Sequence, residues 1–119
     1  MSGLPRFDKK IFSLQELLTA PQRVPHDGVT IFIENRVALG LDSKCSVLTD
    51  DDYDEAGNDF LTATISDITM SDFLPVDAFE QVVDNAHLQR DGVSMEMLLA
   101  AVAFYFENDA FIDFDSIEV

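Results

Sequence analysis

The sequence predicts an α+β fold: an antiparallel sheet of about four strands, with an N-terminal helix and two C-terminal helices packed on one face. Two observations support this prediction. Up to residue 69, β-branched and aromatic residues form short runs that fit strands, whereas from residue 72 apolar residues recur at the 3.6-residue period of helices. Strands followed by helices are typical of α+β domains. At 119 residues, a single domain spanning 1–119 is expected.

The N-terminal helix is predicted over residues 14–20. Ser13 and Glu16 have the spacing of a capping box, in which each side chain bonds the backbone N–H of the other residue. Three leucines then form one apolar face: Leu14, Leu17 and Leu18. This face predicts that the helix packs on the sheet.

Four strands are predicted between residues 29 and 69. They cover 29–34, 37–42, 45–48 and 60–69. The short polar connection Asn35–Arg36 makes the first two a hairpin. The acidic segment 50–59 carries too many charges to enter a core, so it is predicted to be an exposed loop.

Two further helices are predicted in the last third of the chain. The first begins near Pro75 and ends before Asp91–Gly92, with apolar residues on one face. The second is predicted to run from a Ser94 cap to about Glu107. It is apolar on nearly all sides, which places it centrally or in a subunit contact. The tail 111–115 alternates again, so we expect it to add a strand.

The composition is strongly acidic, with 23 Asp and Glu against 7 Lys and Arg and a formal net charge of -16. This charge excludes a general binder of nucleic acid or of anionic membranes, because such surfaces select clusters of Lys and Arg. A hydrophobic fraction of 47% excludes a disordered chain. Residues 1–49 are nearly neutral, and residues 50–119 hold eighteen acids and a single base, Arg90. Such asymmetry suggests an electrostatic partner.

Cysteine usage and the N-terminal residues indicate a cytoplasmic protein. Cys45 is the single cysteine, which excludes an internal disulfide and a multi-cysteine zinc site. No charged segment followed by an apolar one opens the chain as a leader would. The longest uncharged stretch, 97–106, is about half of what a bilayer span needs, so no membrane contact is predicted.

The acidic segment was compared with a calcium-binding loop. An EF-hand loop beginning at Asp50 would put Glu55 where the glycine turn is required and Leu61 where the bidentate Glu belongs. No metal or cofactor is therefore predicted. An irregular cation site, a solvated loop and a partner-binding loop stay open as interpretations of this segment.

Three carboxylates recur on one side of the helix that follows Pro75. Asp77, Glu80 and Asp84 lie opposite its apolar face, and no base interrupts them. An ordinary solvent face, with a first-turn acid that complements the helix dipole, is one interpretation. The other is a stripe of carboxylates that meets the cations of a partner.

The chain offers few groups for catalysis, and no enzyme activity is predicted. His26 and His87 stand alone, without the spacing of a metal or nucleophile motif, and no Gly-rich phosphate loop is present. Acid–base hydrolysis by a pair of carboxylates stays open, since two of the many acids could meet in a cleft.

Several short segments resemble a family of small, acidic, uncharacterised bacterial proteins. They are Lys44–Leu48, Asp50–Asp52, Val83–Ala86, Leu98–Phe106 and Asn108–Ile112. In size and charge the chain is also similar to immunity proteins that neutralise bacterial toxins, including those of contact-dependent inhibition systems. It departs from the all-helical colicin nuclease immunity group, because strands are predicted here. The resemblance implies no catalytic residues.

We therefore predict an immunity protein that binds a cationic partner, such as a basic, nuclease-like C-terminal toxin domain, through an acidic surface. The chain itself is expected to be a monomer or weak dimer. Tyr53, Phe60 or Phe73 would supply an apolar anchor. A phage-type DNA mimic and a non-catalytic regulatory module are the alternatives. The predicted partner-binding residues are Asp50, Asp51, Asp52, Tyr53, Asp54, Glu55, Asp59, Asp77, Glu80 and Asp84.

Overall fold

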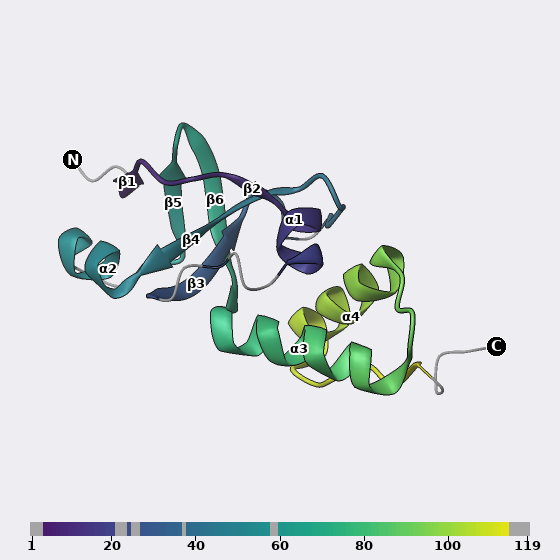
Figure 1. Ribbon diagram of the computed structural model, residues 1–119. Helices are drawn as coiled ribbons and strands as arrows, with labels where there is room; N and C mark the ends of the chain where they lie inside the picture. Colours follow the sequence, from purple (N-terminus) through teal and green to yellow (C-terminus); the bar gives the residue numbers. More distant parts are fainter. Residues whose placement is uncertain (1–3, 21–23, 25–26, 37, 58–59, 115–119) are drawn as a thin grey trace.

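A computed structural model describes residues 4–20, 24, 27–36, 38–57 and 60–114. Within these ranges the chain forms six strands and four helices (Figure 1). Their bounds are β1 Arg6–Phe7, β2 Phe12–Ser13, α1 Leu14–Thr19, β3 Gly28–Ile33, β4 Lys44–Thr49, α2 Asp50–Ala56, β5 Thr62–Ile65, β6 Ile68–Pro75, α3 Val76–Gln89 and α4 Met95–Asn108.

The strands form one mixed sheet in the order β1-β5-β6-β3-β4-β2. All neighbours are antiparallel except β1 and β5, which are parallel. The two outermost strands, β1 and β2, belong to the same short segment near the N-terminus and run in the same direction. That segment, residues 5–13, is called the closing segment below.

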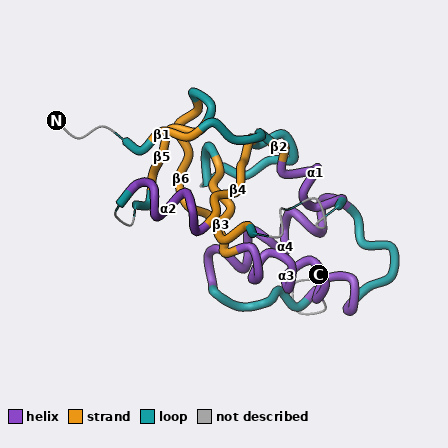
Figure 2. The backbone as a smooth tube through the Cα atoms, turned by 60° about the vertical axis from the view of Figure 1, so that its left-hand side comes forward, coloured by secondary structure: helices purple, strands orange, loops and turns teal. Residues whose placement is uncertain are grey.

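The closing segment joins the two ends of the sheet through adjacent residues. The backbone N–H of Lys9 donates to Ser66 Oγ at 3.1 Å, and that hydroxyl donates to the Lys9 carbonyl at 2.7 Å, beside β5. The next carbonyl, of Lys10, accepts from Ser46 Oγ of β4 at 2.8 Å. Because adjacent Cα atoms lie about 3.8 Å apart, the sheet must curl until its ends meet. The strands therefore enclose a small barrel, and the closing segment can be followed across them in Figure 2.

The predicted four-stranded antiparallel sheet with an N-terminal helix is thus wrong. The fold is α+β, but the sheet has six strands and one parallel pair, and β1 and β2 precede α1. A flat sheet of six strands would separate its edges by about 24 Å. The five residue steps from Phe7 to Phe12 reach at most about 17 Å, so a flat sheet cannot contain both short strands.

Side chains from alternate strand positions fill the barrel. Phe32 of β3 points inward, whereas its neighbours Ile31 and Ile33 point outward into a second core. Both faces of the central strands are therefore buried, which explains their nearly continuous apolar sequence. The buried inner residues are Phe32, Leu48, Ala63, Ile65 and Met70.

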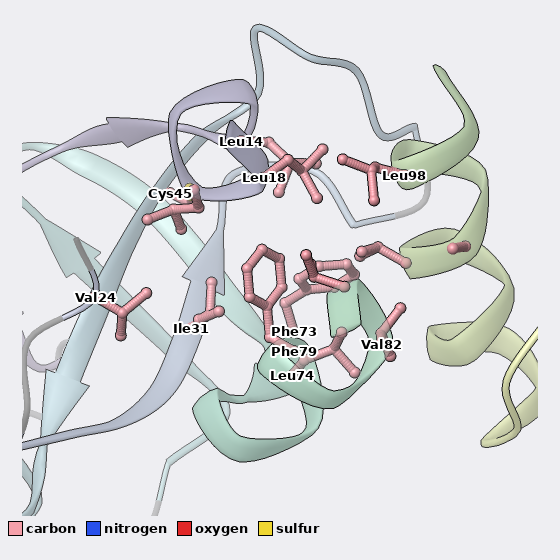
Figure 3. Close-up of a cluster of buried hydrophobic side chains, with 14 of the residues drawn as sticks. Leu14, Leu18, Val24, Ile31, Cys45, Phe73, Leu74, Phe79, Val82 and Leu98 are labelled. Atoms are coloured by element: carbon pink, nitrogen blue, oxygen red, sulfur yellow. The ribbon is translucent and has the colours of Figure 1, made fainter. Parts of the chain in front are cut away.

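Three helices, α1, α3 and α4, enclose the second core beside the barrel, and α4 packs on the other two (Figure 1). Figure 3 shows Leu14 and Leu18 of α1 directed towards Leu98 of α4, with Phe79 of α3 between the helices and the sheet. All four side chains are almost completely buried. The predicted apolar face of the helix after Pro75 lies on this core, through Val76, Phe79, Val82, Val83 and Ala86. Among the described residues, none of the helices combines the length and apolar character that crossing a bilayer requires.

Two predicted strands have other structures. The segment predicted as 60–69 is a hairpin, because Ser66 and Asp67 adopt positive φ angles of 47° and 68° and reverse the chain between β5 and β6. The segment predicted as 37–42 contains no strand within its described residues, 38–42. Instead β4 pairs with β3, so the hairpin prediction is wrong.

The predicted C-terminal strand is also absent from its described residues, 111–114. The side chain of Gln89, at the end of α3, donates to the Ile112 carbonyl at 2.6 Å and accepts from the Phe114 N–H at 3.1 Å. The Gln89 side chain therefore satisfies the backbone groups that a neighbouring strand would otherwise bind. Asp115 lies outside the described residues.

We expect Ser66→Ala to lower the free energy of unfolding by about 1–2 kcal/mol, because two backbone groups of Lys9 lose their partner. Urea denaturation measures this change. Amide exchange should also accelerate at Thr64 and Ser66, which donate to the Pro5 and Phe7 carbonyls. The matched control is Ser71→Ala, whose hydroxyl forms a side-chain hydrogen bond with Thr62 Oγ1 at 3.4 Å and contacts no backbone group of the closing segment among the described residues. Equal effects of the two variants, with unchanged exchange, would contradict closure.

Candidate functional site

The acidic segment predicted as an exposed loop forms a helix over most of its length. In α2, the Thr49 side chain accepts from the Asp52 N–H, and the Asp52 carboxylate accepts from the Thr49 N–H at 2.8 Å, so the two form a capping box. Three acids in the first turn complement the positive end of the helix dipole. Gly57 ends the helix at a φ of 79°, which a glycine adopts without strain.

Asp52 has a structural environment that the other acids of α2 lack. It is only 8% exposed, and its Oδ2 accepts from Lys9 Nζ at 2.9 Å. Burial disfavours the charged form, but the hydrogen bonds from Lys9 and Thr49 together outweigh it, so the pKa of Asp52 lies below its usual value. This predicted binding residue therefore joins α2 to the closing segment.

The remaining α2 acids, Asp50, Asp51, Asp54 and Glu55, form the acidic patch. All four are exposed, and among the described residues none of them takes part in an ion pair. Asp54 and Glu55 lie in the last turn, where the helix dipole disfavours negative charge. Stabilisation of the helix therefore does not explain why acids occur at these two positions. Asp59, the other predicted residue of this segment, lies outside the described residues.

A groove of about 530 Å³ lies between α2 and the ends of β3 and β6. Asp50, Tyr53 and Asp54 line it from α2, and Phe60 and Leu61 line it from the following connection. The Phe60 ring stacks on Tyr53 with centroids 5.0 Å apart, and it also contacts two rings inside the barrel. Leu61 is 66% exposed at the rim. The groove thus combines acidic and aromatic walls.

Two register shifts shape the strand side of the groove. The pairing of β3 with β4 skips Val29, and the pairing of β3 with β6 skips Phe73. Both residues line the groove. Bulges of this kind are common at barrel rims, where they redirect side chains. Asp72, next to the second bulge, also lines the groove, and its Oδ1 accepts from Arg36 Nη1 at 2.7 Å.

The acids predicted on the helix after Pro75 are exposed on α3. Pro75 lines the groove, so the first of them, Asp77, begins this stripe near the groove. Asp84 lies about 10 Å farther along the axis, at 1.5 Å per residue. Asp77, Glu80 and Asp84 therefore extend away from the acidic patch rather than forming one compact cluster with it.

The sequence did not identify Asp72, Leu61 or Val29 as site residues. Each becomes part of the groove through tertiary structure: two bulges and the approach of α2 to the ends of distant strands. Their local sequence carries no signal for this. All three predicted apolar anchors, Tyr53, Phe60 and Phe73, line the groove. Phe73 is only 5% exposed, however, and it also packs on Phe106 of α4.

The described residues offer few groups for metal binding or for catalysis by histidine or cysteine. Within it, no three side chains of His, Cys, Asp and Glu gather in a way that could hold a metal ion. His87 is exposed on α3, and His26 lies outside the described residues. The Cys45 thiol is completely buried. Burial, together with the charges of Glu16 and Glu34, raises its pKa to about 12.

Comparison with known proteins identifies a family but no activity. A family model described as Domain of unknown function (DUF7716) matches residues 11–114. No curated protein matches the chain, and no solved structure matches it either. The likeness to immunity proteins therefore rests on the sequence alone.

We expect Asp52→Asn to lower the free energy of unfolding by about 1–3 kcal/mol, because a buried charge-assisted hydrogen bond is lost. The lowered pKa of Asp52 stabilises the fold above the usual value of 3.8, and this stabilisation disappears as the pH falls below it. Denaturant unfolding between pH 7 and pH 3 measures both effects. The control is Asp51→Asn, which changes an exposed neighbour. Similar stabilities and pH profiles for both variants would contradict the role of Asp52.

We expect the Cys45 thiol to react with a thiol reagent at pH 8 only when the protein unfolds. The folded thiol stays neutral to about pH 12, whereas an ordinary thiol ionises near 9.0, so the free energy of unfolding should decrease as the pH rises above 9.0. Rapid labelling of Cys45 in the native protein would show that β4 is accessible to the reagent, and this would contradict the structure.

Proposed function

The chain belongs to the DUF7716 family of domains of unknown function. We propose that it is a cytoplasmic immunity protein. In this proposal it binds and neutralises a basic, nuclease-like toxin domain through the acidic patch and the adjoining groove. The proposal requires no cofactor and no reaction by the chain itself.

The observation that carries the proposal is the concentration on α2 of negative charge that forms no ion pair with any described residue. Its four exposed carboxylates lie within seven helical residues, a length of about 10 Å. The screening length at physiological salt is about 8 Å. The four charges therefore act together on an approaching cation, whereas acids spread over the whole surface would be screened from one another.

The cationic cleft of a nuclease offers the matching surface. Opposite potentials accelerate encounter and orient the two proteins before they touch. The apolar wall of the groove then supplies contact area that excludes water, which a purely charged surface lacks. An inhibitor seated in this way blocks access of the nucleic acid substrate to the cleft.

The alternatives need different surfaces. A DNA mimic requires carboxylates in a long array at phosphate-like intervals, whereas the acidic patch is compact. A regulatory oligomer built on α4 would bury apolar surface and would persist at high salt. The compact patch favours a single cationic protein face.

We expect cells that express a basic toxin domain, encoded beside the gene for this chain, to survive when the chain is co-expressed. For the purified pair, the association rate should fall steeply as salt rises from low to physiological concentration. A variant with Asp50→Asn, Asp51→Asn, Asp54→Asn and Glu55→Gln should associate at least about tenfold more slowly at low salt. Stopped-flow fluorescence measures these rates.

The control for that variant is the stripe on α3. Glu80→Gln and Asp84→Asn together remove two exposed charges that lie beyond Asp77 on α3 and farther from the groove, and we expect a smaller change in rate. An association rate that is flat across the salt range, or a toxin that still kills in the presence of the chain, would contradict the proposal.

A further inference from the structure

We propose that the groove beside α2 holds an arginine side chain of the cationic partner; this deepens the proposed function, on which it rests for the source of the arginine. The acidic patch attracts any cation, but the groove has a composition suited to a planar one. Its volume of about 530 Å³ lies in the range of sites that hold small ligands.

Two carboxylates that form no ion pair with a described residue flank the groove. Asp50 and Asp54 are four residues apart on α2, so they lie on the same side of the helix, and both line the groove. Asp51 and Glu55, the other two acids of the patch, do not line it. Half of the patch therefore faces the groove, and half faces elsewhere.

The aromatic wall supplies the second part of the site. Tyr53 lies between Asp50 and Asp54 in the sequence of α2, and its ring stacks on Phe60. A guanidinium group packs flat against an aromatic ring while its N–H groups bind carboxylates at its edge. The side-chain methylenes of an arginine can cover Leu61, which is exposed at the rim.

The chain already binds one guanidinium in this manner at Asp72 of β6. Arg36 donates from Nη1 to the Asp72 carboxylate at 2.7 Å and to the Asp72 carbonyl at 2.9 Å. Its Cζ lies 5.7 Å from the centroid of the Phe106 ring. Asp72 also lines the groove, so the groove repeats a combination of carboxylate and ring that holds an arginine within the fold.

Arginine fits this groove better than lysine. A lysine ammonium is a compact and strongly hydrated charge, and it loses more hydration when it enters a partly apolar site. A guanidinium is weakly hydrated and offers several N–H donors in one plane, which two carboxylates on one helix side can share.

The test uses the full chain and two small probes, acetyl-arginine amide and acetyl-lysine amide, which have the same charge. In NMR titrations, the arginine probe should shift the amides of Tyr53 and Leu61. It should bind about two- to fivefold more tightly than the lysine probe, as stacking on a half-buried ring predicts. Equal binding of both probes, or shifts confined to residues outside the groove, would overturn the proposal.

Two double variants of equal charge separate the groove from general attraction. Asp50→Asn with Asp54→Asn should weaken the arginine probe about five- to tenfold, because both charge-assisted hydrogen bonds are lost. Asp51→Asn with Glu55→Gln should change its affinity less than about twofold, because only screened attraction is removed. The single variant Asp54→Asn is a control for unfolding of α2, because Asp54 lies in the last turn and its charge does not stabilise the helix N-terminus. Equal weakening by both double variants would overturn the proposal.

The outcome also separates this inference from the proposed function. If the groove variant loses the probe but still associates with the toxin domain at the wild-type rate and affinity, the anchor is refuted and the immunity function stands. If the probe binds as described while no basic toxin domain is bound, the groove stands and the immunity function is refuted.

Discussion

The closing segment determines the geometry of everything else in this fold. Lys9 bonds to Ser66 beside β5, and Lys10 bonds to Ser46 on β4, so two adjacent residues hold together the ends of a sheet whose strands are far apart in sequence. The same Lys9 reaches Asp52 on α2 with its side chain. Closure of the barrel and placement of the acidic helix are therefore coupled through one residue.

This coupling explains why a short helix with so many negative charges is held in place. Asp52 and Tyr53 turn inward, one to the lysine and one to the Phe60 ring, while the remaining acids face solvent. The inward residues anchor α2 over the open end of the barrel. The groove follows from this position, because α2 then lies beside the two bulges at the ends of β3 and β6.

Local patterns in the sequence predicted some features and not others. The period of the apolar residues after Pro75, and the serine cap before Met95, correspond to α3 and α4. The cap of α2 was missed because Asp52 takes the place that Glu or Gln usually has in a capping box, and because a run of acids suggests a solvated loop. The turn between β5 and β6 was also missed, because Ser66 and Asp67 reverse the chain without the glycine that usually indicates such a turn.

Closure and the groove could not be predicted in this way, because neither has a local signal. The bond between Lys9 and Ser66 joins residues 57 positions apart, and nothing in either segment indicates the other. A bulge such as that at Phe73 changes which side chains face the groove without altering the alternation that a reader of the sequence sees. The acids of α2 and the aromatic residues of the groove could be predicted from the sequence, whereas Val29, Leu61 and Asp72 join the site only through tertiary structure.

The central claim is that a cationic partner docks on the acidic patch and groove at the open end of the barrel. Mapping of amide chemical shifts in the chain, with and without a bound basic toxin domain, tests it most directly. The account predicts that the changes concentrate on α2, on Phe60 and Leu61, and at the ends of β3 and β6. Changes confined to α4 and the far end of α3, with α2 unaffected, would contradict it.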